Sequence, residues 1–313
     1  MWSYLAQRML AAIPTMVVVA VFVFGLINLT PGDPAVLLAG DNATPEQVER
    51  IRERLFLDEP IWTRFLIWAG NAAQLDLGAS IYSNQPVTRL IAQRIEPTLM
   101  LATVTMIFTL AMALPFGILA AWKPNTLIDR AIMAFAVLGF SVPVFVIGYL
   151  LAYIFAVELR WFPVQGYKPL ADGPLETLRS LTLPALALAF VFAALIARVT
   201  RAAMLEVLSA NYIRTARSKG LSTLRILIVH ALKAAGVPVV TVIGVGMATL
   251  VGGVVVTESV FNIPGIGRLT VDAIVRRDYP VVQGVILFFS FLLIAINLLV
   301  DMSYALFDPR VRG

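Results

Sequence analysis

Residues Asn211 to Pro238 read NYIRTARSKGLSTLRILIVHALKAAGVP and lie between two long apolar segments. The stretch contains no acidic residue, and its basic side chains are Arg214, Arg217, Lys219, Arg225 and Lys233. Lys and Arg in a short connector between membrane spans keep that connector on the cytoplasmic side, because they resist translocation. The stretch therefore predicts a polytopic membrane protein with a basic connector facing the cytoplasm.

The interior of this connector is patterned, which topology alone does not require. Four residues at helical spacing predict a short amphipathic helix that ends at a glycine suited to a C-cap: Tyr212, Ile213, Ala216 and Gly220. A second amphipathic run follows, and its expected apolar side is Leu224, Leu227, Ile228, Ala231 and Leu232. Two such helices at a membrane face favour a docking element for a cytoplasmic partner.

The composition places much of the chain in lipid. The 313 residues are 59% hydrophobic and 14% charged, with a mean hydropathy of +0.86, whereas globular chains are about 25% charged. The absence of cysteine excludes disulfides and thiolate metal sites. In a membrane protein, the net charge of +5 reflects loops placed by the positive-inside rule, so no nucleic-acid partner is expected.

Six apolar blocks are long enough to cross a bilayer core of about 30 Å. The first is Met9 to Leu29, within a segment of residues 1–29 that also includes the N-terminus. It is favoured as an uncleaved span over a signal peptide, because the apolar run is too long and no small-residue cleavage site closes it. The others, at about 98–122, 131–157, 181–197, 237–257 and 281–300, form a core transmembrane domain over 98–300, with a coupling loop at 198–236 and a tail at 301–313. Six spans put both termini on one side, and the connector predicts that this side is the cytoplasm.

Residues 30–97 are polar and more acidic than basic. Thr44 followed by Pro45 predicts a helix start, and Pro60 predicts another. A third short helix is expected from Pro86 to Ile95. The segment is interpreted as a small helical cap on the outer side of the membrane domain, in preference to a separately folding receptor.

The chain lacks the sequence motifs of nucleotide and metal sites. It contains neither G-x-x-x-x-G-K-[ST] nor H-E-x-x-H, and its single histidine, His230, has no acidic residue nearby in sequence. No catalytic residue, metal ligand or bound cofactor is therefore expected, and any ATP that drives this protein must be bound by another chain.

Two further groups of residues are candidates for function. Gly244, Ala248 and Gly252 repeat on one face of the fifth span, where small residues allow close packing within the chain or against a second membrane subunit. Glu258 and Asn262 follow that span and are candidate residues of a translocation path, although a solvated or paired acid at a helix end is the simpler interpretation of Glu258. A solvated outer-face helix and gate scaffold is expected for Asp272, Arg276, Arg277 and Asp278.

Several of these motifs carry a family resemblance. Arg214-Thr215-Ala216-x-x-x-Gly220 resembles the EAA loop of ATP-binding-cassette (ABC) importer permeases, which contacts the ATPase subunits. The resemblance narrows to the dipeptide, oligopeptide and nickel permease family through LTPGDP (Leu29–Pro34), HAL (His230–Leu232), TESVFNIPGIGRL (Thr257–Leu269) and DPR (Asp308–Arg310). The chain departs from the general loop pattern at Arg214, which replaces the loop's glutamate, and at Pro238, which comes late.

The resemblance implies an all-α, type I ABC importer permease in the bacterial inner membrane. It assigns ATPase coupling to Asn211, Tyr212, Ile213, Arg214, Thr215, Ala216, Arg217, Ser218, Lys219 and Gly220. The implied partners are a homologous second permease, two cytoplasmic ATPase subunits that bind ATP and Mg²⁺, and an extracytoplasmic solute-binding protein. The solute stays open among dipeptides, oligopeptides, glutathione, nickel chelates, sugars and opines.

Two other classes of function compete with this interpretation. A membrane scaffold or sensor would use the basic loop to bind a partner or anionic lipid, but lipid binding requires charge and not a glycine-closed helix. An ion-coupled carrier would show charges within its spans or inverted repeats, and the sequence shows neither.

Overall fold

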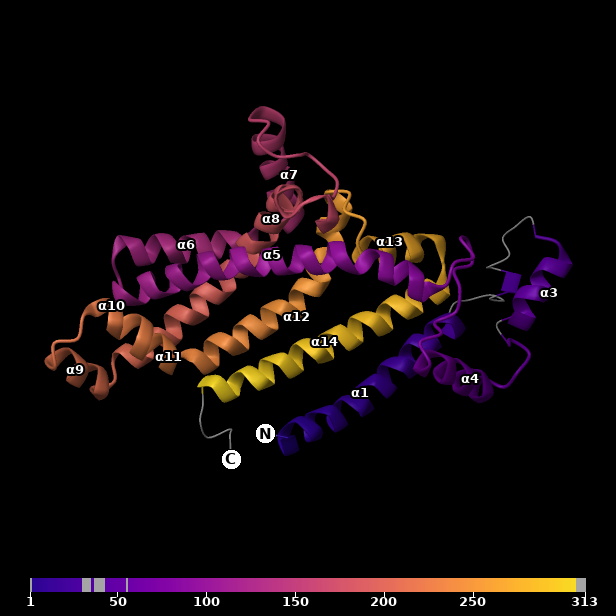
Figure 1. Cartoon of the computed structure of the whole chain (residues 1–313), viewed down its shortest axis with the longest axis horizontal. Helices are drawn as coiled ribbons and strands as arrows, with labels where there is room; N and C mark the ends of the chain where they lie inside the picture. The colour runs from indigo at the N-terminus through magenta and orange to yellow at the C-terminus, as the bar shows by residue number, and fades with distance from the viewer. Residues whose placement is uncertain (1, 30–34, 37–42, 55, 308–313) are drawn as a thin grey trace. The chain divides into compact units, whose positions relative to one another are not determined.

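Helices form the regular structure in the described part of the chain, apart from one isolated bridge between Ala79 and Pro86. This computed structural model describes all residues except 1, 30–34, 37–42, 55 and 308–313 (Figure 1). The DPR motif, LTPGDP beyond Leu29 and the end of the expected tail lie outside these described residues.

The element bounds follow the labels of Figure 1. The elements up to the bend in the third span are α1 (Trp2–Leu29), α3 (Pro45–Arg54), α4 (Ile61–Ala73), α5 (Val87–Trp122), α6 (Leu127–Ser141) and α7 (Val144–Leu151). The π-helix η1 (Ala152–Glu158), the 3₁₀-helix η2 (Leu170–Asp172), α8 (Pro174–Leu208), α9 (Asn211–Ser218) and α10 (Thr223–Arg225) come next. The last elements are the π-helix η3 (Ile226–Ala231), α11 (Leu232–Ala234), α12 (Gly236–Val260), α13 (Ile266–Arg276) and α14 (Tyr279–Phe307).

The described helices confirm the predicted all-α polytopic fold. Five of them, α1, α5, α8, α12 and α14, are long and apolar enough to cross a membrane. A sixth span is formed if α6 is counted together with α7 and η1, which are bent by 104° relative to it.

The bend in this third span is set by Pro143. Val142, directly before it, has φ −97° and ψ 124°, because a residue that precedes proline is pushed out of the helical region. Pro143 then becomes the N-cap of α7. The structure therefore shows a change of direction at this proline rather than a shallow kink.

Two helices are longer than their apolar blocks. The expected short helix at Pro86–Ile95 is not separate, because α5 runs unbroken through Pro97 for 36 residues. Buried residues on both sides of this proline, Ile91 before it and Leu101 after it, hold the helix together. Likewise, the block at 181–197 is only the middle of the 35-residue α8. The ends of α8 carry charged residues, so a hydropathy pattern does not include them.

The chain divides into two compact units. The first comprises Met1–Leu5, Pro97–Pro264 and Ala295–Gly313. At its centre lies α8, which packs against α6, α7 and α12. Glycines allow the closest approaches: a Cβ at Gly117 of α5 would lie 2.6 Å from Thr200 Cβ, and one at Gly139 of α6 would lie 2.9 Å from Ala194 Cβ.

The second unit comprises Ala6–Glu96 and Gly265–Ile294. Its core joins the start of α5 to α13 and the start of α14, through Val87, Leu90, Ile91, Ile266, Leu269, Ala273, Val281 and Val285. The end of the 30–97 segment therefore shares one hydrophobic core with the helix that follows the fifth span.

Candidate coupling and translocation sites

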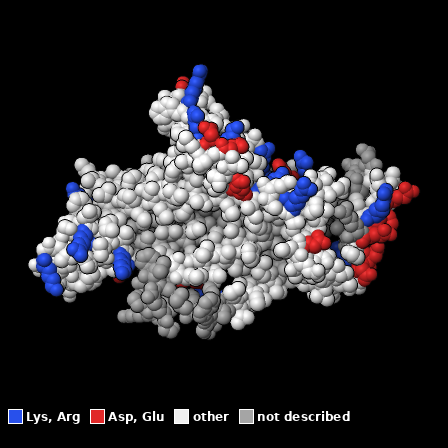
Figure 2. Space-filling model, in the orientation of Figure 1, with Lys and Arg blue, Asp and Glu red and all other residues white. Residues whose placement is uncertain are grey.

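The predicted coupling helix is present as α9, which lies on the surface of the first unit. Ile213 is completely buried, and α9 contacts η3. The charged residues Arg214, Arg217 and Lys219 are exposed. Figure 2 shows basic side chains gathered over the end of the molecule that α9 and α10 form in Figure 1.

Gly220 closes α9 as the spacing predicts. Its φ of +76° lies in the left-handed region. The Leu221 N–H donates to the Ala216 carbonyl at 3.3 Å, and the Gly220 N–H donates to the Arg217 carbonyl at 2.9 Å. These two bonds are the Schellman pair that ends a helix in a left-handed residue. A Cβ at Gly220 would meet nothing within 4 Å, so the backbone conformation, and not crowding inside this chain, requires glycine.

The second amphipathic run is present, but its buried side differs from the prediction. Leu227 and Ala231 are buried as expected, whereas Leu224 is 71% exposed and Ile228 is 45% exposed. Ile226 is buried instead. The reason is the π-helix η3, whose wider turn places Ile226 and Ala231, five residues apart, on the same side.

Next to the coupling helix, η3 belongs to a small apolar cluster that reaches two membrane helices. Leu227 and Ala231 pack with Ala121 at the end of α5 and with Met204 near the end of α8. This cluster therefore connects η3, which contacts α9, with the ends of α5 and α8.

A buried ion pair in the same unit was not predicted from the sequence. Arg201 of α8 donates from Nε to Asp129 Oδ1 at 2.5 Å and from Nη2 to Asp129 Oδ2 at 2.7 Å. The backbone N–H of Asn125 also donates to this carboxylate, at 2.9 Å. The pair fixes the turn between α5 and α6 to α8, seven residues before α8 ends. The available signal was Thr126-x-x-Asp129, which is a capping pattern, and Thr126 is indeed the N-cap of α6.

Glu258, a candidate for the translocation path, is fully buried in the first unit. Thr98 Oγ1 donates to Glu258 Oε1 at 2.6 Å, so the carboxyl is not a solvated group at a helix end. Its neighbour Asn262 is exposed and has φ +54°. The turn between them is held by Gly166, whose N–H donates to the Phe261 carbonyl at 2.9 Å. The pairing interpretation of Glu258 is therefore the one that its geometry fits.

The small-residue face of α12 has two different environments. Gly244 is buried, and a Cβ there would lie 2.6 Å from Val300 Cγ2 of α14, so this end packs within the chain. Ala248 is partly buried, whereas Gly252 is exposed, and a Cβ added to it would meet nothing within 4 Å. Packing within the chain therefore applies at Gly244, whereas Gly252 has no close neighbour within the described chain.

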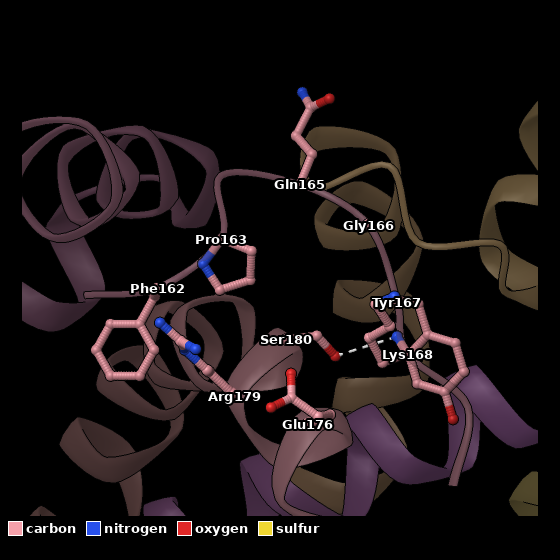
Figure 3. A pocket seen from close by; sticks show the side chains of 9 residues that line it. All are labelled: Phe162, Pro163, Gln165, Gly166, Tyr167, Lys168, Glu176, Arg179 and Ser180. Carbon is pink, nitrogen blue, oxygen red and sulfur yellow. Dashed lines mark hydrogen bonds between the residues drawn. The ribbon is translucent and has the colours of Figure 1, made fainter. Parts of the chain in front are cut away.

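A recess lies beside the loop between η1 and α8 (Figure 3). Arg179 turns its guanidinium to the Trp161 carbonyl, with Nε at 3.2 Å and Nη2 at 3.0 Å. Ser180 Oγ accepts from the Lys168 N–H at 3.3 Å. The recess is open and its charged residues, including Glu176, are exposed, so it lacks the enclosure of a solute-binding cavity.

The corner after α13 corrects the expectation of a wholly solvated helix. Asp278 is only 5% exposed. Its carboxylate accepts from Ser80 Oγ at 2.5 Å and from the Ile81 N–H at 3.2 Å. Asp272, Arg276 and Arg277 are exposed as expected. Asp278 is therefore an anchor within the second unit rather than a surface charge.

The described residues contain no group of three His, Asp or Glu side chains placed to hold a metal ion. His230 lies in η3 and is partly buried.

Comparisons with known proteins agree along the whole chain. Residues 113–313 match the family model described as the binding-protein-dependent transport system inner membrane component, and residues 1–102 match the model for the N-terminal part of such membrane components. The chain is 49% identical over 312 residues to a protein of Sinorhizobium fredii named as a probable peptide ABC transporter permease, covering 100% of both chains. It is 43% identical to the glutathione transport system permease GsiC of Escherichia coli, covering 100% of this chain and 99% of that one.

A solved structure shares the fold. The inward-facing MetNI methionine ABC transporter contains a chain that aligns with a TM-score of 0.58 at 19% identity, covering 70% of this chain and 96% of that one. At this identity the likeness concerns the fold alone.

Proposed function

The chain belongs to the inner-membrane components of binding-protein-dependent transport systems, and from this membership we propose that α9 couples it to the ATP hydrolysis of partner subunits. The chain is a multi-pass permease subunit of a peptide-type ABC importer and not an enzyme. Its coupling to ATP hydrolysis, its partner subunits and its solute are part of the proposal.

One observation carries the coupling proposal: α9 is closed by glycine, rests on one buried side chain and presents its charges outward. Ile213 is its only buried residue. Its side-chain hydrogen bonds in the described structure, those of Thr215 and Ser218, stay within the helix. A helix held this lightly and exposed on its remaining sides is suited to insertion into a groove of another protein.

The path from such a groove to the membrane helices is apolar. A displacement of α9 is transmitted through Ile213 to η3. From η3 it is transmitted through Leu227 and Ala231 to the ends of α5 and α8. The Asp129–Arg201 pair ties α6 to the same end of α8. Three spans therefore respond to the position of one short helix.

The proposed assembly contains a homologous second permease, two ATPase subunits and an extracytoplasmic solute-binding protein. ATP and Mg²⁺ are bound by the ATPase subunits. Both termini and α9 face the cytoplasm, since α9 and the following segment carry the basic side chains that resist translocation. A reporter fused after Gly313 is expected to be active only in the cytoplasm, and one inserted after Gln165 only outside.

The solute is proposed to be a peptide or a similar small molecule. Relatives named for peptide and for glutathione transport support this class. Glu258 remains a candidate residue of the path, but its burial beside Thr98 means that it reaches a solute only if the turn at Asn262 moves.

The coupling proposal is tested by Gly220→Val and Ala216→Trp. A side chain in the left-handed region costs about 1–2 kcal/mol, and the added bulk in both variants occupies space that α9 leaves open for a partner. Both variants should reach the membrane at normal abundance and lose most solute uptake. Solute uptake and ATPase co-purification are measured at matched membrane abundance.

Gly173→Val is the control for backbone strain. Gly173 has φ +122° and also has nothing within 4 Å of an added Cβ, but it lies directly before α8. This variant should retain uptake. Arg214→Glu should weaken ATPase association in a salt-dependent way, since it reverses an exposed charge. Normal uptake by both Gly220→Val and Ala216→Trp would leave the loop as a topology anchor and favour a scaffold or sensor.

The second-permease proposal is tested on α12. Gly244→Leu should destabilise this chain itself by about 1–3 kcal/mol through overpacking against Val300. Gly252→Leu should leave the isolated chain unchanged and reduce its co-purification with the second permease. Equal co-purification of Gly252→Leu and the parent protein would show that this end of the face meets lipid.

A further inference from the structure

The helix α4 is largely apolar, with Arg64 and Asn71 on one side, and none of its residues is buried. Its sequence is IWTRFLIWAGNAA, and Arg64 is its only charged residue. None of its 13 residues is buried in the described structure. A largely apolar helix normally lies in a protein core or in a membrane, and a core position is excluded here by the exposure.

The length of α4 excludes a membrane-spanning position. At 1.5 Å per residue, 13 residues extend about 20 Å, which is short of the roughly 30 Å of a bilayer core. The remaining membrane environment for such a helix is the boundary between the acyl chains and water, where amphipathic helices lie parallel to the membrane plane.

One side of α4 is attached to the end of the first span. The ring of Phe24 lies 5.4 Å from that of Phe65 and 5.7 Å from that of Trp68, measured between centroids. The guanidinium carbon of Arg64 lies 5.9 Å from the Phe24 ring centroid. Phe24 lies five residues before α1 ends at Leu29. These contacts attach α4 to the C-terminal part of α1 (Figure 1).

The other side of α4 presents large apolar side chains. Trp62 is 77% exposed and Leu66, one turn later, is 69% exposed. The adjoining span is equally open, since only 6% of its apolar window is buried in this chain. Phe22 and Val21, near Phe24, are exposed as well. The exposed face of α4 is thus attached to an apolar helix that is itself largely unburied in this chain.

We propose that α4 is an interfacial helix, with Trp62 and Leu66 inserted among the lipids at the membrane surface where α1 ends. Tryptophan suits this position, because its ring is apolar and its N–H remains close to water. Arg64 does not oppose this position, since its guanidinium lies over the Phe24 ring on the attached side of α4. Lipid is the occupant of the face, and α4 fixes the depth of the first span.

The absence of cysteine from the natural chain allows a direct test. Single cysteines replace Leu66 and Asn71, which lie on opposite sides of α4, and Glu53, which is exposed on the polar helix α3. The complete transporter, with cysteine-free partner subunits, is labelled with a nitroxide and placed in phosphatidylethanolamine–phosphatidylglycerol vesicles. Collision rates are measured with oxygen, which concentrates in the acyl chains, and with a water-soluble nickel chelate.

The Leu66→Cys label should collide more often with oxygen than with nickel, and the Glu53→Cys label should show the reverse. Asn71→Cys should lie between them. Each variant must retain uptake, which shows that the labelled protein is folded. A Leu66 label that collides mainly with nickel would place this face in water. A label shielded from both reagents would mean that a protein partner covers α4. Either result would overturn the proposal.

Discussion

The helices α9 and α13 end in the same backbone conformation but are held in different ways. Both close with a left-handed residue and a Schellman pair of hydrogen bonds. After α13 the residue is Arg277, with φ +57°, and the pair runs from Asp278 N to Ala273 O at 2.8 Å and from Arg277 N to Ile274 O at 3.1 Å. After α9 the left-handed residue is Gly220.

The difference between the two corners is in their side chains. At α13, Asp278 binds Ser80 and Ile81, and the Tyr82 hydroxyl donates to the Arg276 carbonyl at 2.7 Å. An arginine is tolerated in the left-handed region because these bonds fix the corner. The corner after α9 has no such bonds in the described structure and uses glycine instead. The corner after α9, which we propose a partner binds, has no side-chain hydrogen bonds to other described segments. The corner after α13, which joins two segments of the chain, has them.

Removing Asp129 should have the largest effect on stability. Its ion pair with Arg201 joins α6 to α8 in the unit that carries α9. Asp129→Ala leaves Arg201 partly buried without its carboxylate, which typically costs about 3–5 kcal/mol. The measurement is thermal unfolding of the purified chain in detergent. Uptake should fall as well, since α6 loses its tie to α8.

The double variant Asp129→Leu with Arg201→Met is the control for this prediction. Replacing both partners of a buried pair with apolar residues is often neutral or stabilising, so the double variant should recover most of the stability lost by Asp129→Ala. If the double variant is as unstable as the single variant, the instability of Asp129→Ala does not come from the unpaired charge of Arg201, and other contacts of Asp129 stabilise this part of the unit.

Removing Asp278 should have a smaller effect on the other corner. Asp278→Ala leaves the Ser80 hydroxyl and the Ile81 N–H without their acceptor, at a cost of about 1–3 kcal/mol. Asp272→Ala, on the exposed side of the same helix, should change stability by no more than about 0.5 kcal/mol. Protection of the Ile81 amide against hydrogen exchange reports the corner directly, and equal protection in both variants would contradict the proposed anchor.

The general architecture could be predicted from the sequence because hydropathy and loop charge act locally. The six apolar blocks, the glycine at the end of α9 and the basic connector all follow from residues within one or two turns of each other. The same reasoning predicted a segment at 181–197 that is shorter than α8, because hydropathy does not detect charged helix ends. It also predicted a helix break at Pro97 that is absent, because packing against distant residues can keep a helix continuous through proline.

The contacts between distant residues could not be predicted in the same way. Asp129 and Arg201 are 72 positions apart, and Ser80 and Asp278 are 198 apart. A single sequence gives each of these residues the pattern of a surface charge or a turn. The misassigned side of the second amphipathic run has a local cause, since a pattern of period 3.6 cannot anticipate the π-helix η3.

Exchanging the left-handed residue should have the smallest effect and tests the comparison most directly. Arg277→Gly relieves left-handed strain of about 1 kcal/mol or more, and the added freedom of the unfolded glycine offsets about 0.5–1 kcal/mol of it. The net gain should therefore be small but positive while Asp278 holds the corner. In the Asp278→Ala background, Arg277 can leave the left-handed region and release the strain by itself, so Arg277→Gly should bring no gain. The four proteins form a double-mutant cycle measured by thermal unfolding. An equal gain in both backgrounds would show that the conformation of Arg277 does not depend on the Asp278 bonds, and the two corners would then differ in sequence but not in how they are held.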